Sequence, residues 1–263
     1  MILALVNNKG GVGKTTTAVN LAAALAGPKR RVLLVDLDAQ ASASLSLGTA
    51  REDLDPSAAA VLLEGLPATS AVRDTSVEGL QLLPGSMELA NVDLQLAALQ
   101  DPQRALQNAL RPLQAAYDLI FVDCPPSLSL LTVNALVAAD AYIVPVQPHY
   151  LALEGLVNLE AAVERVRAGI GTKARLLGLL LTLVDYRTRA TREVVELIRG
   201  HYKRGVFQTE IRVNTRLAEA PSFGQSIFQY DKASSGADAY RLLARELIRR
   251  LTSKDGKMEG WKE

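Results

Sequence analysis

The chain has 263 residues, a formal net charge of +1, and hydrophobic and charged fractions of 49% and 22%, which are ordinary values for a soluble globular protein with a substantial core. A net charge so close to zero gives no overall attraction to nucleic acid or to a membrane, so any polyanion must bind to a local patch. One cysteine, Cys124, excludes a disulfide framework or a cysteine-ligated cluster within one subunit, and the two histidines have no metal-ligand spacing.

Predicted strands and helices alternate along the chain. The first apolar run, residues 2–6, is a predicted strand rather than a signal peptide, because no basic region precedes it and polar NNKGG follows at once. No apolar run approaches the roughly 20 residues that span a bilayer, so we expect a soluble, cytoplasmic protein. Further Val-, Ile- and Leu-rich strands are predicted over 31–36, 80–84, 118–123, 141–146 and 174–184. Helices are predicted over 15–26, 56–64, 102–116, 130–139, 153–168, 189–202 and 233–251.

This alternation predicts an α/β fold with one doubly wound, mostly parallel sheet flanked by helices. We expect residues 1–252 to form a single domain, because the sequence has no internal repeat and no linker rich in Gly, Ser or Pro. Residues 253–263 are polar apart from Met258 and Trp261, and we expect them to form a disordered tail.

The segment NNKGGVGKTT, residues 7–16, has the character of a phosphate-binding loop between a strand and a helix. Its glycines permit turns closed to other residues and expose successive N–H groups, and the helix N-terminus adds its own unpaired N–H groups. Lys14 would neutralise the β and γ phosphates, and the Thr15 hydroxyl would ligate Mg²⁺. The usual pattern has a glycine where Asn8 stands, and an additional lysine, Lys9, follows it. A glycine-rich turn that only caps a helix is the alternative interpretation.

The predicted strand 31–36 runs into two carboxylates, Asp36 and Asp38. The carboxyl edge of an open α/β sheet is where ligands bind. Two residues apart on an extended chain, the two side chains are expected to point the same way. One would then hold a metal-bound water while the other orients an attacking water. An acidic strand end that merely meets solvent is the alternative.

A third motif, DLIFVDCPPS at 118–127, places Asp123 at the end of another apolar run. This is the position of the strand aspartate that backs Mg²⁺ in phosphate-loop NTPases. The two prolines that follow prevent an immediate helix and stiffen the segment beside the γ-phosphate. Cys124 is interpreted as a packing residue rather than a nucleophile.

These three motifs, in this order, resemble those of the deviant Walker A ATPases. Within that superfamily of phosphate-loop NTPases, the chain is similar to ParA/Soj-type partition ATPases of chromosomes or plasmids, and the resemblance extends to about Arg250. The segments that carry it are 9–16, VDLDAQ (35–40), VDCPPSLS (122–129), VPVQPHYLALEGL (144–156) and NTRLAEAPSFGQSI (214–227). The altered loop marks the superfamily, and LAEAPSFG narrows the resemblance to the ParA branch.

The resemblance implies a slow, Mg²⁺-dependent ATPase that forms a sandwich dimer on binding ATP. Lys9 would reach the phosphates of the other subunit's nucleotide, Asp38 would position the hydrolytic water, and Asp123 would support Mg²⁺ from behind its ligands. The catalytic set is then Lys9, Lys14 and Asp38, and the metal set is Thr15, Asp38 and Asp123. The nucleotide-binding set is Lys9, Gly10, Gly11, Val12, Gly13, Lys14, Thr15, Thr16 and, at the adenine, Asn214. Where the family usually has a proline two residues before this asparagine, the chain has Arg212.

The resemblance also implies that the ATP-bound dimer binds double-stranded DNA without sequence preference until a ParB-type partner stimulates hydrolysis. The stretch 187–216 carries a local net charge of +5 and few aromatic side chains, which favours phosphate contacts over base stacking. A solvated helix face is the alternative interpretation of this stretch. The expected DNA-binding residues are Arg187, Arg189 and Arg216. The protein is thus expected in the cytoplasm, associated with the nucleoid.

Other functions are compatible with parts of the sequence. The amphipathic, basic segment 242–251 resembles the membrane-targeting helix of MinD, a superfamily relative that cycles on membranes, although a helix packed on the sheet is favoured. Cluster carriers such as the nitrogenase iron protein need bridging cysteines, and an amidating ligase needs a small-molecule pocket for which no motif is found. Because the first strand begins at Ile2, we expect no N-terminal helix-turn-helix and no operator binding.

Overall fold

The computed structural model describes residues 1–252, and a seven-stranded sheet runs through the molecule in the order β3-β4-β2-β5-β1-β6-β7. Neighbouring strands are parallel except for β3 and β4. The strands are β1 (Ile2–Leu5), β2 (Val32–Asp36), β3 (Arg73–Asp74), β4 (Leu80–Leu83), β5 (Leu119–Asp123), β6 (Ala141–Val146) and β7 (Arg175–Leu181). The predicted doubly wound, mostly parallel sheet is confirmed, while the predicted tail 253–263 lies outside the described residues.

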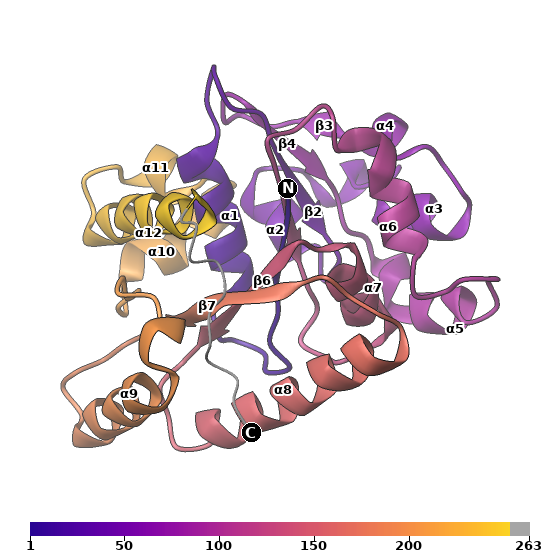
Figure 1. Cartoon of the computed structure of the whole chain (residues 1–263). Helices are drawn as coiled ribbons and strands as arrows, with labels where there is room; N and C mark the ends of the chain where they lie inside the picture. The colour runs from indigo at the N-terminus through magenta and orange to yellow at the C-terminus, as the bar shows by residue number, and fades with distance from the viewer. Residues whose placement is uncertain (253–263) are drawn as a thin grey trace.

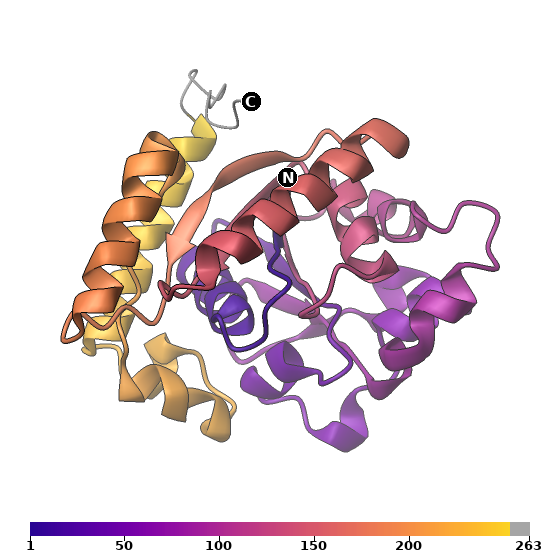
Figure 2. The same cartoon turned by 90° about the horizontal axis from the view of Figure 1, so that it is seen from below.

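Helices cover both faces of the sheet (Figure 1). One face is covered by α1 (Lys14–Leu25), α2 (Ser42–Ser46), α10 (Thr215–Glu219), α11 (Ile227–Tyr230) and α12 (Ser235–Thr252). The other is covered by α3 (Ala58–Leu63), α4 (Ala68–Ala71), α5 (Val92–Leu96), α6 (Ala105–Leu110), α7 (Leu130–Ala138), α8 (Ala152–Gly169) and α9 (Arg189–Tyr202). The long helix α8 crosses the near face of the molecule in Figure 2. Because both faces are covered, the central strands are buried throughout, and β2 and β5 are apolar up to the aspartates that end them.

Two predicted elements extend beyond the observed ones by more than two residues at one or both ends. The helix predicted over 102–116 is helical only in α6, and a 3₁₀ turn (Arg111–Leu113) follows it. Pro112 is the reason, because it has no N–H to donate and its ring clashes with the preceding turn. The strand predicted over 174–184 ends at Leu181, since Leu183 adopts a left-handed conformation with φ 51°. The chain there leaves β6, and Val184 N–H donates to Ile211 O at 3.1 Å.

The last helix packs on the sheet through its apolar side. Tyr240, Leu243 and Leu247 of α12 are buried and share a core with Leu21 of α1. The apolar side chains that an interfacial membrane helix would use are therefore largely occupied within the fold. Among residues 1–252, no helix is both long and apolar enough to cross a bilayer.

The topology gathers three strand ends at the centre of one sheet edge. β1 lies between β5 and β6, and β2 lies on the other side of β5. The register pairs Asp123 with Leu5 of β1 and with Asp36 of β2. The loop that follows β1 is thus placed beside the carboxylates that end β2 and β5, as expected for a ligand site at the carboxyl edge.

Candidate nucleotide-binding site

The loop 7–13 between β1 and α1 is anchored at both ends. At its start the Asn7 side chain donates to Pro145 O at 2.7 Å and accepts from Lys9 N–H at 2.9 Å. Near its end the Thr182 hydroxyl donates to Val12 O at 2.8 Å. Gly13 precedes α1 with φ 80°, a left-handed conformation that favours glycine. The loop therefore presents its backbone, and the N-terminus of α1, toward a pocket.

Lys14 is the first residue of α1, and only 6% of it is exposed. Its ammonium group donates to Lys9 O at 2.8 Å, a backbone oxygen of its own loop. Burial lowers the pKa of Lys14, although the carboxylates of Asp123 and Asp38 act in the opposite direction. An anionic ligand in the pocket would stabilise the charged form of this lysine.

Asp123, at the end of β5, is fully buried, and neither carboxylate oxygen has a hydrogen-bond partner among the described residues. Burial raises the pKa of Asp123 well above its ordinary value, and the neighbouring charge of Asp36 adds to the shift. Unpartnered buried carboxylate oxygens are costly, and a cation or its bound water would satisfy them. The residue therefore fits the predicted role of backing Mg²⁺.

The prediction that Asp36 and Asp38 point the same way is wrong. Asp36 is fully buried, and its two oxygens accept from Asp38 N–H at 3.1 Å and from the Ser44 N–H and hydroxyl at 2.9 and 2.8 Å. Asp38 instead lies on the pocket wall. The strand ends at Asp36, so the alternation of side chains along an extended chain stops there. The side chain of Asp36 instead accepts hydrogen bonds from the turn that follows. Burial raises the pKa of Asp36 to about 6.

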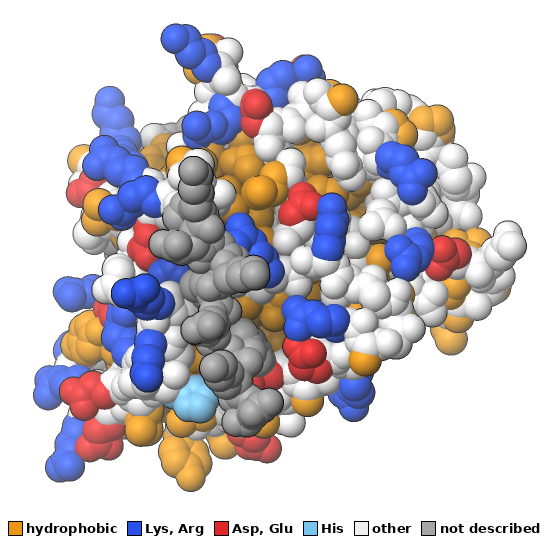
Figure 3. Space-filling model, viewed as in Figure 1, with side chains coloured by type: hydrophobic (Ala, Val, Ile, Leu, Met, Phe, Trp, Pro, Cys, Tyr) orange, Lys and Arg blue, Asp and Glu red, His pale blue; other side chains and the backbone are white. Residues whose placement is uncertain are grey.

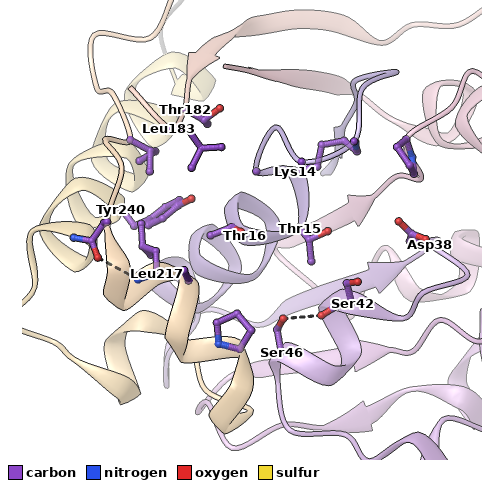
Figure 4. A pocket seen from close by; sticks show the side chains of 18 of the residues that line it. Lys14, Thr15, Thr16, Asp38, Ser42, Ser46, Thr182, Leu183, Leu217 and Tyr240 are labelled. Atoms are coloured by element: carbon purple, nitrogen blue, oxygen red, sulfur yellow. Dashed lines mark hydrogen bonds between the residues drawn. The ribbon is translucent and has the colours of Figure 1, made fainter. Parts of the chain in front are cut away.

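The pocket at this edge has a volume of about 450 Å³. Figure 4 shows Lys14, Thr15 and Asp38 toward one end of it and Leu183 and Leu217 toward the other. Of the predicted site residues, Gly10, Gly11, Gly13, Lys14, Thr15, Thr16, Asp38 and Asn214 line the pocket. Lys9, Val12 and Asp123 do not line it. Asp123 and Val12 are buried, and the side chain of Lys9 is directed elsewhere.

Lys9 reaches toward helix α8 rather than into the pocket. Its ammonium group donates to the backbone oxygen of Leu151, immediately before that helix. A Cβ atom at Gly155 would lie 2.8 Å from Cε of Lys9, so the glycine leaves the space that the lysine occupies. The side chain of the additional lysine thus makes no contribution to its own pocket in this arrangement.

Asn214 lines the pocket but also begins helix α10. Its side-chain oxygen accepts from Leu217 N–H at 3.1 Å, and its amide nitrogen donates to Ser235 at 2.9 Å. An asparagine at this position is a strong N-cap. Part of its hydrogen-bonding capacity is therefore used within the fold.

The predicted DNA-binding arginines are exposed and engaged in ion pairs. Arg187 pairs with Asp185 at 2.6 Å, and Arg189 pairs with Glu193 at 2.6 Å. Arg216 lies 2.9 Å from Glu219 and 3.5 Å from Asp231. Exposed pairs of this kind contribute little to stability, so a phosphate can compete for these arginines.

The segments that carry Arg187 and Arg216 lie next to each other. A parallel backbone bridge joins Val184 to Arg212, and each arginine follows within four residues. Figure 3 shows Lys and Arg side chains gathered on the side of the molecule that carries α9, α11 and α12. The basic stretch is therefore a surface assembled from two strand-like segments and α9, and not one helix face.

Three residues of this region were not anticipated. Ser44 holds the Asp36 carboxylate, and Thr182 and Leu183 line the pocket from the end of β7. Their position near the end of the predicted buried strand 174–184 was the available signal for the latter two, because all parallel strands end at the same edge. Ser44 gave no comparable signal.

Within residues 1–252 no group of three or more His, Cys, Asp or Glu side chains is arranged to hold a metal ion alone. Cys124 is buried, and burial raises the pKa of its thiol, as expected of a packing residue. A cation at this site would thus depend on Thr15, the carboxylates and the ligand's own oxygens, the donor set that Mg²⁺ prefers.

The sequence matches the family described as an AAA domain over residues 1–176. It is 48% identical to the chromosome-partitioning ATPase Soj of Thermus thermophilus over 95% of this chain and 96% of that protein. It is 43% identical to the chromosome partitioning protein ParA of Myxococcus xanthus over 96% and 89% of the two chains. The chain belongs to the ParA/Soj family. This confirms the predicted family and the assignment as a phosphate-loop ATPase.

Among solved structures, the ParA/Soj-family chain is similar to one named cobyrinic acid a,c-diamide synthase from Mycobacterium smegmatis. The TM-score is 0.83 at 36% identity, and 99% of each chain is covered. That protein was crystallised with an ATP analogue and magnesium. The likeness over the whole described fold agrees with the nucleotide site built above.

Proposed function

We propose that this chain is a DNA-partitioning ATPase whose ATP-bound sandwich dimer holds double-stranded DNA without sequence preference. Hydrolysis, stimulated by a ParB-type partner, separates the dimer and releases the DNA. The protein would cycle between the nucleoid and the cytoplasm. The names of the ParA and Soj relatives support this proposal at 40–48% identity.

The observation that carries the proposal is that the side chains of Lys9 and Lys14, close together in the sequence, are directed to different places. Lys14 faces its own pocket, whereas Lys9 lies outside that pocket and contacts the surface near α8. A cation attached to the loop but directed away from its own site is available to a nucleotide bound by a second copy. Each subunit of a dimer would then complete the other's site.

The pocket residues divide by role. Lys14 and the N–H groups of the loop and of α1 would hold the phosphates, and Asp38 would orient the attacking water. Thr15, Asp38 and the buried Asp123 would hold Mg²⁺ and its waters. When bound, Mg²⁺ neutralises charge that develops on the phosphate oxygens. Closure of the second subunit would exclude bulk water from the site.

DNA binding is assigned to Arg187, Arg189 and Arg216. Dimerisation doubles the number of these residues on one particle. Binding that is weak for the monomer becomes strong for the dimer, because the second contact occurs at high effective concentration. Dissociation after hydrolysis would remove that advantage.

Co-sedimentation tests the proposal directly. The wild-type protein is incubated with ATP, ADP or no nucleotide, and then with random-sequence duplex DNA or with anionic vesicles. We expect ATP-dependent binding to DNA and no binding to vesicles. Binding to vesicles but not to DNA would instead identify a membrane-cycling ATPase of the MinD kind.

The name of the mycobacterial structure provides a second candidate, an ATP-dependent amide synthase acting on cobyrinic acid. That candidate predicts ATP consumption that depends on cobyrinic acid and an amide donor. The partition candidate predicts ATP consumption that rises when DNA and a ParB-type protein are added and does not change when cobyrinic acid is added. One steady-state assay with each addition in turn separates the two.

A further inference from the structure

The end of the pocket farthest from the phosphate loop is built from the segments 182–184 and 211–217. Leu183 and Leu217 lie at that end (Figure 4), and Arg212, from the second of these segments, is also among the residues that line the pocket. A nucleotide whose phosphates lie on the loop must place its base toward this end. Asn214 is also present, but its amide group already caps α10 and binds Ser235. Another polar side chain is therefore available to meet the base.

That side chain is Arg212, which is exposed and held against an aromatic ring. Its guanidinium carbon lies 5.4 Å from the centroid of the Tyr186 ring. The bridge between Val184 and Arg212 fixes the two backbones beside each other. A guanidinium group is planar, so it can stack on an aromatic ring with one face and on a second planar group with the other.

Tyr186 itself is anchored. Its hydroxyl donates to both oxygens of Glu210, at 2.8 and 2.9 Å, and Arg199 pairs with the same carboxylate at 2.7 Å. The ring is thus a fixed support for the guanidinium, and Arg212 loses little further side-chain entropy when a ligand stacks on it.

We propose that Arg212, supported on the Tyr186 ring, stacks its free face on the purine base and closes the base end of the pocket. The inference rests on the proposed function in taking the ligand to be ATP. Stacking depends on the flat ring of a base and not on the hydrogen-bonding groups along its edge. Arg212 therefore contributes affinity for purine nucleotides and does not distinguish adenine from guanine.

The test is competition binding on the full chain with ATP, GTP and inorganic tripolyphosphate as probes at about 0.15 M salt, where distant charges are screened. Arg212→Ala is expected to weaken the binding of ATP and of GTP by the same factor, about three- to tenfold, because one stacking interaction with the base is removed. Its affinity for tripolyphosphate, which has no base, should stay within twofold of wild type. Arg165→Ala removes an exposed charge on α8 and should change none of the three.

Substitutions at Tyr186 complete a double-mutant cycle. Tyr186→Phe keeps the ring and should bind ATP within twofold of wild type, whereas Tyr186→Leu should lose about threefold. The double variant Tyr186→Leu with Arg212→Ala should bind no more weakly than Arg212→Ala alone, because the support acts only through the arginine.

Two results would overturn the inference. One is an Arg212→Ala protein that binds ATP as wild type does. The other is an equal loss for tripolyphosphate, which would mean that the substitution distorts the whole pocket. In both cases wild-type binding of ATP leaves the proposed function standing. A wild-type protein that does not bind ATP would overturn the proposed function and this inference together.

Discussion

The ammonium group of Lys14 donates a hydrogen bond of 2.8 Å to the backbone oxygen of Lys9. The loop thus supplies a hydrogen-bond partner for its own buried lysine. A phosphate oxygen carries a full charge and would replace this carbonyl as the acceptor. The loop that would hold the phosphates therefore also holds the lysine that would neutralise them.

Replacing Lys14 should abolish nucleotide binding. Lys14→Met keeps the aliphatic length but removes the charge that faces the phosphates. We expect ATP affinity to fall at least about 100-fold, since hydrogen bonds to a charged group of this kind contribute on the order of 3 kcal/mol. Isothermal titration calorimetry measures the loss, and an unchanged melting temperature shows that the fold is retained. Binding within tenfold of wild type would contradict the assignment.

Replacing Lys9 should separate binding from dimerisation. Lys9→Ala removes a side chain that lies outside its own pocket, so ATP affinity should stay within about threefold of wild type. Light scattering after size exclusion should then show a monomer in ATP where the wild type is a dimer. A normal ATP-dependent dimer in this variant would refute the role of Lys9 across the interface.

Gly155 provides a complementary substitution. The Cβ of Gly155→Ala would lie 2.8 Å from Cε of Lys9 and would push the lysine off Leu151 O. We expect dimerisation in ATP to become about two- to fivefold tighter, because a competing hydrogen bond worth on the order of 1 kcal/mol is removed from the monomer. Gly169→Ala, in the same helix, meets no atom within 4 Å and is the matched control. Weaker dimerisation in Gly155→Ala alone would show that the contact with α8 aids assembly.

Asp38 and Asp36 should give different phenotypes. Asp38→Ala is expected to bind ATP and dimerise but to hydrolyse it at least about 100-fold more slowly, as expected for loss of a group that orients the nucleophile. Asp36→Ala should instead lower the free energy of unfolding by about 2 kcal/mol, because the Ser44 N–H and hydroxyl lose their buried acceptor. Steady-state turnover and urea denaturation of both variants make the comparison. Full turnover in Asp38→Ala would move the catalytic role elsewhere.

Arg216→Ala should weaken DNA binding equally for unrelated sequences. Removing one arginine that neutralises a phosphate reduces the slope of log affinity against log salt by about 0.9. ATP-driven dimerisation should be unchanged, since Arg216 pairs with Glu219 and Asp231 of its own surface. Arg51→Ala, an exposed charge in the 3₁₀ turn Arg51–Asp53, is the control. A sequence-dependent loss would contradict binding through phosphates alone.

Glu246 makes stability depend on pH. It accepts from the backbone N–H groups of Gln208 and Thr209 at 2.8 and 2.9 Å, and Arg250 pairs with it at 2.9 Å. Burial on its own raises the pKa of Glu246, but these hydrogen bonds outweigh it and hold the pKa below the ordinary value of 4.5. The folded state therefore binds this proton more weakly than the unfolded chain. The stabilisation is complete above pH 4.5 and is lost as the pH falls below it.

Glu246→Gln should lower the free energy of unfolding at pH 7 by about 2 kcal/mol, the cost of unmatched buried donors. The difference in the free energy of unfolding between this variant and wild type should shrink as the pH is lowered from 4.5. Urea denaturation at several pH values measures it, with the exposed Glu196→Gln as control. A difference independent of pH would show that packing, and not the charge, is responsible.

The fold class was predictable because its signals are local. Buried strands such as β5 and β6 are short apolar runs, and the Gly-rich loop occupies ten consecutive residues. Errors arose where a backbone change overrides a pattern, as at Pro112 and at Leu183. The family assignment followed from motif order, which also needs no tertiary information.

The sequence by itself determined the phosphate loop, the aspartate-ended strands and the family, because each depends on residues close together along the chain. Only the tertiary structure decided which of Asp36 and Asp38 faces the pocket, since that depends on a turn held by Ser44. It also placed Lys9 against Leu151, 142 residues away, and Arg212 against Tyr186. Contacts between distant segments depend on how the sheet and its helices pack, and no local pattern encodes them.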